Sequence, residues 1–211
     1  MMTNENLFQK LIDSTKKDFQ GKHWTAYKAL VDSDEKIYKN FPKLEATGEI
    51  PNLIVCTAYV GSGKTTFSGK LVERGYKVVE SDRVRDEVLG GILNPPEQEA
   101  KVTKAMVELR DHFLLHGYDT IIAACSVNNF YRELFLSTNV PVNNKMLLFL
   151  KTDRKIIEER RGKRGYELID MLWEDPDPNA PFMQDVKYFE ISSNNREDIN
   201  ENIERVLKEL E

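Results

Sequence analysis

The chain has 211 residues, of which 30 are Lys or Arg and 35 are Asp or Glu, so its formal net charge is −5. This length fits one domain, or one domain with a small appendage, and hydrophobic residues at 40% are enough for a sizeable core. The acidic balance excludes a general affinity for nucleic acids, because a nucleic-acid partner would need a local patch of clustered Lys and Arg.

The cysteines, histidines and apolar runs narrow the class of protein further. Cys56 and Cys125 both lie in apolar runs, which favours free thiols in an intracellular protein over a disulfide. His23, His112 and His116 have no spacing that is typical of a metal site. No apolar stretch approaches ~18 residues, and the N-terminus lacks the regions of a signal peptide. We therefore expect a cytoplasmic protein without a membrane partner.

The first 49 residues differ from the rest of the chain. Leu7, Leu11 and Ile12 repeat at helical spacing, and a second apolar series runs from Ala26 to Ile37. Breakers at Pro42, Gly48 and Pro51 then predict a loop. We expect a helical N-terminal extension over residues 1–49, followed by the main domain over residues 50–211.

From residue 50 onward, short β-rich runs alternate with amphipathic stretches. Strands are predicted at residues 52–59, 76–81, 119–127, 145–152 and 186–192. Helices are predicted at residues 65–74, 82–91, 95–117, 128–139, 153–165, 166–175 and 195–211. This alternation favours a three-layer α/β fold of the P-loop type, with about five parallel strands and helices on both faces of the sheet.

The stretch "AYVGSGKT", residues 58–65, fits the phosphate-binding P-loop (Walker A) pattern, with Ala58 where Gly is commoner. Gly61 and Gly63 permit a loop whose successive N–H groups point at one anion, and the following helix adds its positive end. Lys64 would reach the β- and γ-phosphates, and Thr65 would offer its hydroxyl to Mg²⁺. The expected nucleotide site is Gly61, Ser62, Gly63, Lys64, Thr65 and Thr66. The alternative is a glycine-rich turn that binds nothing.

A second candidate group follows the second predicted strand, in "VVESDRVRDEV". Asp82 and Arg85 are three positions apart, so they share one face of a helical turn at the carboxyl end of the sheet. A carboxylate there could accept the proton of an incoming hydroxyl, and an arginine could hold the acceptor. The alternative is a helix cap formed by Ser81 or Asp82 with a surface ion pair.

The basic stretch "EERRGKRG" predicts a lid. Arg160 and Arg164 lie four residues apart, so they point the same way if the helix persists. A cationic segment that closes over a triphosphate would stabilise the migrating phosphoryl group and exclude water. The alternative is a solvated helix end that complements the helix dipole.

In this order, "GSGKTT", "SDRVRDEV" and "ERRGKRG" resemble the P-loop kinases related to the polynucleotide 5′-hydroxyl kinase domain, a group that includes zeta-toxin-like and antibiotic-phosphorylating kinases. The resemblance covers roughly residues 53–210. It implies that Asp82 is the general base, that Arg85 binds the acceptor, and that Arg160 and Arg164 are the lid arginines.

The chain departs from this group at the third predicted strand, whose end often has an Asp. Here the place holds Ala123, Ala124 and Cys125, so metal positioning would depend on Thr65 and Asp82 together with waters. Just past this strand, Ser126, Asn128 and Arg132 could form part of an acceptor pocket, or Asn128 could cap the next helix.

The predicted function is ATP- and Mg²⁺-dependent transfer of the γ-phosphoryl group to an acceptor hydroxyl. The acceptor could be a nucleic-acid 5′ end such as an oligonucleotide, or a nucleotide or small metabolite, and the acidic net charge favours the latter. A second hypothesis is a nucleotide-binding regulatory or partner-binding module that has lost its chemistry. The missing strand-end Asp favours the second hypothesis, whereas Asp82, Arg85 and the lid arginines favour the first.

Overall fold

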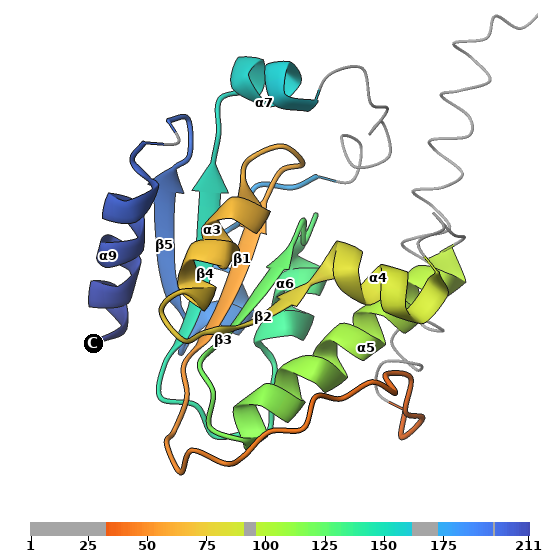
Figure 1. The fold of residues 1–211 in the computed structure, drawn as a ribbon. Coiled ribbons are helices and arrows are strands. Elements are labelled where there is room, and N and C mark those ends of the chain that lie inside the picture. Colours follow the sequence, from red (N-terminus) through yellow and green to blue (C-terminus); the bar gives the residue numbers. More distant parts are fainter. Residues whose placement is uncertain (1–32, 91–95, 162–172, 196) are drawn as a thin grey trace, which may run out of the picture.

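The computed structural model describes residues 33–90, 96–161, 173–195 and 197–211. Within these ranges the chain forms a five-stranded sheet of order β2-β3-β1-β4-β5 in which every neighbouring pair is parallel (Figure 1). The strands are β1 Leu53–Ala58, β2 Lys77–Glu80, β3 Thr120–Ala124, β4 Lys145–Lys151 and β5 Lys187–Ser192. The predicted strands and their parallel arrangement are therefore confirmed.

The central strands have continuous apolar sequences because helices cover both faces of the sheet. All six residues of β1 and all five of β3 are buried, which is typical of strands inside a parallel sheet. Cys56 on β1 pairs with Ala123 on β3 and Leu148 on β4. This register brings the carboxyl ends of the three strands to one edge of the sheet.

The helices form two layers around the sheet. Their bounds are α3 Lys64–Val72, α4 Ser81–Leu89, α5 Pro96–Leu115, α6 Asn129–Leu136, α7 Arg154–Arg161 and α9 Ile199–Leu210, with a 3₁₀ turn η1 at Pro181–Met183. Val55 of β1 packs in a cluster with residues of α5 and α6, and its neighbours Ile54 and Cys56 pack in a second cluster with α3 and α9. Successive strand residues face opposite layers, which confirms the three-layer α/β fold.

The described part of the N-terminal extension is irregular, so the helix predicted as far as Ile37 is wrong over residues 33–37. Tertiary contacts determine its path instead. The backbone N–H groups of Ile37 and Tyr38 donate to the carboxylate of Glu108 on α5. The buried Tyr38 side chain joins the core, and its hydroxyl donates to Glu87 on α4. The division between an extension and a domain near residue 50 stays a prediction.

Two further sequence predictions concern residues that lie mostly or wholly outside the described ranges. The helix predicted at 166–175 lies mostly outside the described residues, and Trp173 to Asp175, which are described, are irregular. Arg164 of the predicted lid also lies outside them. No helix in the described ranges is both long and apolar enough to cross a membrane.

Candidate active site

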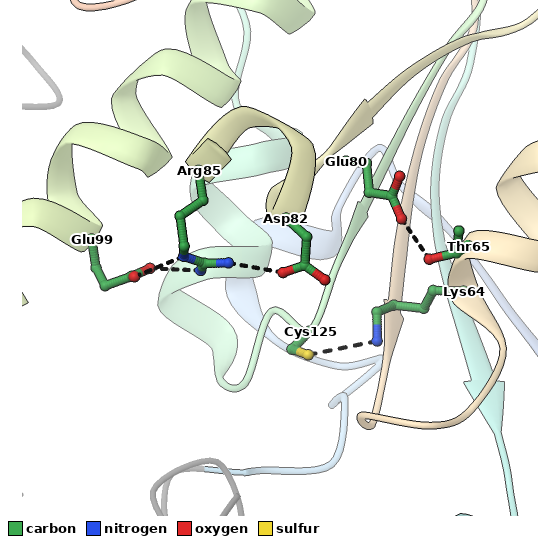
Figure 2. Close-up of polar contacts among 7 residues, drawn as sticks. All are labelled: Lys64, Thr65, Glu80, Asp82, Arg85, Glu99 and Cys125. Atoms are coloured by element: carbon green, nitrogen blue, oxygen red, sulfur yellow. Dashed lines mark hydrogen bonds and ion pairs between the residues drawn. The ribbon is translucent and has the colours of Figure 1, made fainter. Parts of the chain in front are cut away.

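The predicted site residues that the structure describes gather at the carboxyl edge of the sheet. The loop from Tyr59 to Gly63 follows β1, Glu80 ends β2, and Cys125 follows β3. Figure 2 shows the Asp82 carboxylate on α4 pointing into the space between Arg85 and Lys64. Loops at this edge of an open α/β sheet are where ligands bind.

The loop after β1 has the backbone of a phosphate cradle. Gly61 and Gly63 have φ values of +88° and +93°, a region that residues with a side chain seldom adopt. Gly63 is the N-cap of α3 and supplies no side-chain hydrogen bond, so main-chain N–H groups at the start of α3 are not capped by a side chain. The Ser62 hydroxyl is buried without a hydrogen-bond partner in the described chain. These observations fit an anion at the positive end of α3.

Lys64 is folded back over this loop. Its Nζ donates to the carbonyl oxygens of Ala58 at 3.1 Å and Tyr59 at 3.2 Å. It also contacts Sγ of Cys125, 3.5 Å away, at the end of the third strand (Figure 2). Both cysteines are free thiols, as predicted. Burial raises the pKa of Cys56 to about 12, which keeps that thiol protonated at neutral pH.

Glu80 is a site residue that the sequence analysis missed. The hydroxyl of Thr65 donates to Oε1 of Glu80 across 2.5 Å (Figure 2). Because the Thr65 hydroxyl donates its hydrogen bond to this carboxylate, the lone pairs of the hydroxyl oxygen remain available to a cation. The sequence signal was an acid at the last position of the second strand, two residues before Asp82. Thr65 and Glu80 therefore form a donor set that fits Mg²⁺, whose ligands are oxygens.

Asp82 and Arg85 lie on one face of α4, as predicted. Nη1 of Arg85 donates to Oδ1 of Asp82 at 2.8 Å, and the Asp82 side chain is 85% exposed. The predicted cap is wrong, because the N-cap of α4 is Glu80 and it makes no side-chain cap bond. The Asp82–Arg85 ion pair itself is expected both for a catalytic pair and for a structural pair on the surface, so it does not decide between these two interpretations.

Glu99, near the start of α5, is a second residue that the sequence analysis missed. Its two carboxylate oxygens accept from Nε and Nη2 of Arg85 at 3.0 and 2.9 Å. The side chains are 19% exposed in Arg85 and 29% exposed in Glu99. The hydrogen bonds that Arg85 donates to Glu99 raise the pKa of Arg85, so this guanidinium is charged at neutral pH. No sequence signal links these residues, because the contact depends on how α5 packs on α4.

Arg160 lies beside the loop between β5 and α9 and lines a cavity next to the P-loop. Its guanidinium donates to the backbone oxygens of Ser193 at 2.9 Å and Asn194 at 2.8 Å, in the loop between β5 and α9. The Ser193 hydroxyl in turn donates to the backbone oxygen of Ser62 at 2.8 Å. A small cavity between this loop and the P-loop is lined in part by Gly61, Thr66, Arg160 and Asn195. Arg160 thus connects the predicted lid helix to the phosphate loop.

The residues after β3 are mostly structural. Asn128 caps α6, since its Oδ1 accepts from the backbone N–H of Tyr131 at 3.4 Å, and this decides between its two predicted roles. Arg132 is fully buried, donates to Asn129 and to the backbone oxygen of Glu174, and lies 5.5 Å from the Trp173 ring. Burial lowers the pKa of Arg132 to about 10.

A family model described as an AAA domain matches residues 53–171, which is more than half of the chain. A search of curated proteins found no match.

Several solved structures have the same fold. A sugar kinase from Janibacter sp. HTCC2649 is 19% identical, with a TM-score of 0.55 over 75% of this chain and 93% of its own. The Mycobacterium tuberculosis APS kinase, solved with AMPPNP and APS, is 17% identical, with a TM-score of 0.54 over 76% and 97%. Chaetomium thermophilum Kti12, solved with ADP-AlF3, is 16% identical, with a TM-score of 0.54 over 75% and 99%. At such identities the likeness shows the fold.

Proposed function

We propose that the chain, which belongs to the AAA domain family, is a kinase that transfers the γ-phosphoryl group of ATP to a hydroxyl group, with Mg²⁺ as cofactor. Its resemblance to the P-loop kinases related to the polynucleotide 5′-hydroxyl kinase domain supports this proposal. The observation that carries the proposal is that one edge of the sheet brings together a phosphate-binding loop and the Asp82–Arg85 pair of α4. The kinases among the structures of the same fold support it.

On the nucleotide side, the main-chain N–H groups of the P-loop hold the terminal phosphates. Lys64 exchanges the carbonyl oxygens of Ala58 and Tyr59 for phosphate oxygens, where its charge opposes the charge that develops in the transition state. Thr65 and Glu80 would hold Mg²⁺, which would supply further neutralisation of phosphate charge. Arg160 and Arg164 are the candidate lid cations, with Arg160 already next to the P-loop cavity.

On the acceptor side, Asp82 acts as the general base. The acceptor oxygen forms a bond to the γ-phosphorus, the bond from that phosphorus to the β–γ bridging oxygen breaks, and ADP leaves with the bonding electrons. The hydroxyl proton goes to the Asp82 carboxylate, whose exposure of 85% leaves it accessible to an acceptor. Arg85 orients this carboxylate through its Nη1 bond, in addition to any contact with the acceptor.

The test is a single-turnover assay with γ-labelled ATP over a panel of hydroxyl compounds, including a 5′-hydroxyl oligonucleotide. The wild-type protein should transfer label, and Lys64→Ala should abolish transfer, since a cationic side chain that contacts the migrating phosphoryl group, such as an arginine finger, is worth about 10³–10⁵-fold. A Lys64→Ala variant with near-wild-type transfer would contradict the proposal.

A second candidate function is a nucleotide-binding module without transfer activity. The observation that favours it is that Cys125, rather than a carboxylate, contacts Lys64 at the end of β3. Tight binding of AMPPNP without label transfer to any acceptor would support this function over the kinase.

A further inference from the structure

The acceptor side of the site has an excess of negative charge. Two carboxylates, Asp82 and Glu99, flank the single guanidinium of Arg85, so this group of three has a net charge of −1 (Figure 2). An acceptor that approaches Asp82 therefore meets a negative field before it meets the P-loop.

Arg85 is already engaged by protein carboxylates. Glu99 occupies Nε and Nη2 in a two-bond, fork-shaped pair, and Asp82 occupies Nη1. An anionic acceptor could bind the Nε–Nη2 edge of Arg85 only by displacing Glu99, whose side chain is 29% exposed, and at Nη1 it would compete with the Asp82 carboxylate. Losing a charged partner from such a pair is unfavourable.

The other described arginines near this edge are engaged elsewhere. Arg83 pairs with Glu87 at 3.0 Å and is 71% exposed. Arg132 is buried against Trp173 and the Glu174 backbone, and Arg160 bonds to the backbone of the β5–α9 loop. Lys64, the other cationic residue drawn in Figure 2, faces the phosphate loop. The described acceptor side thus offers no uncommitted arginine for an anion.

We propose that the acceptor is a hydroxyl compound without negative charge, either a neutral polyol or an amine-bearing one, and that Glu99 determines this specificity. The proposal rests on the proposed kinase function and narrows its acceptor class. Glu99 neutralises the arginine that would otherwise bind a phosphate or carboxylate group, and so disfavours anionic acceptors by charge repulsion. Nucleic-acid ends and sugar acids fall in the disfavoured class.

The first experiment measures anion binding without requiring a known acceptor. Sulfate is titrated calorimetrically into the protein saturated with AMPPNP and Mg²⁺, so that the phosphate loop is already filled. Wild-type protein should show no saturable sulfate site. Glu99→Gln should gain one, at least about tenfold tighter than any binding by wild type, and Arg85→Gln should remove it in the double variant.

Glu87→Gln is the matched control, because it removes a carboxylate from α4 that pairs with Arg83 rather than with Arg85. This variant should behave as wild type toward sulfate. Thermal unfolding of each variant checks the fold, and Glu99→Asp, which keeps the charge but shortens the reach, should give an intermediate sulfate affinity. Saturable sulfate binding by wild type that Arg85→Gln abolishes would overturn the proposal, as would a Glu99→Gln variant that gains no site.

The second experiment compares three hydroxyl compounds of similar size: glucosamine, glucose and gluconate. In single turnover with labelled ATP, wild type should favour the cationic and neutral compounds over gluconate by about tenfold or more, and Glu99→Gln should reduce that ratio. A wild-type preference for gluconate contradicts the proposal. Absence of transfer to every acceptor would instead contradict the kinase function, and the sulfate titration would still decide the charge of the site.

Discussion

The two sides of the candidate active site differ in the kind of group that forms them. The phosphate side is main chain: a loop between β1 and α3 whose shape is set by two glycines with positive φ. The acceptor side is a set of charged side chains on α4 and α5, joined through Arg85. Under the proposed function, the backbone loop would hold the phosphates and the side-chain charges would select the acceptor. The comparison then assigns the general chemistry to the loop and the specificity to the ion pairs.

Replacing the base on the acceptor side should have the largest effect after loss of Lys64. Asp82→Asn should slow transfer by about 10²–10⁴-fold while AMPPNP affinity stays near that of wild type, because the carboxylate acts on the hydroxyl proton. Single-turnover rates and calorimetric binding check the two quantities separately. An equal loss in both would assign Asp82 to the phosphate side, as a metal ligand, and would remove the distinction between the two sides.

A substitution at Glu80 tests whether this residue belongs to the metal site on the phosphate side. Glu80→Gln should raise the Mg²⁺ concentration for half-maximal transfer by about 10–100-fold, because the Thr65 hydroxyl loses the charged partner that orients it. Mn²⁺ titration followed by electron paramagnetic resonance, with AMPPNP present, gives the same shift without turnover. Glu73→Gln, which removes a surface partner of Lys70, is the control. An unchanged metal dependence would exclude Glu80 from the metal site.

The role of backbone geometry can be isolated at one glycine. An added Cβ at Gly63 would meet no atom within 4 Å, so Gly63→Ala introduces strain at φ +93° without a steric clash. The strain of about 1–2 kcal/mol should weaken AMPPNP binding by roughly tenfold. Gly69→Ala, on α3 with equally open surroundings but without positive φ, should leave binding unchanged. Equal effects in both variants would refute the conformational account.

The smallest effect concerns the back of α4, where Tyr38 donates to Glu87. This hydrogen bond lowers the pKa of Glu87, so its stabilisation is fully present above the ordinary carboxyl value of 4.5 and is lost as the pH falls through the lowered value. Tyr38→Phe should reduce the free energy of unfolding by about 1 kcal/mol at pH 7 and by less in strong acid. Urea unfolding at several pH values measures this, and a pH-independent difference would contradict it.

Local patterns predicted the phosphate side better than the acceptor side. The glycines, Lys64 and Thr65 lie within five residues, between a buried strand and a helix, so spacing alone indicated their arrangement. Glu99 lies 14 residues from Arg85, and the strand-edge position of Glu80 became informative only when β2 was placed beside the P-loop. The helix predicted as far as Ile37 was wrong because distant residues also determine the structure there. Glu108 and Glu87 fix the path of residues 37 and 38 against their local helical pattern.

The ring of Trp173 lies 5.3 Å from that of Tyr59, the residue that opens the P-loop after β1, and the Arg132 guanidinium lies 5.5 Å from the Trp173 ring. The chain has one other tryptophan, Trp24. In a Trp24→Phe background, indole emission would therefore come from a single site next to the phosphate loop. Nucleotide occupancy could then be followed as a change in fluorescence intensity or wavelength, without a label.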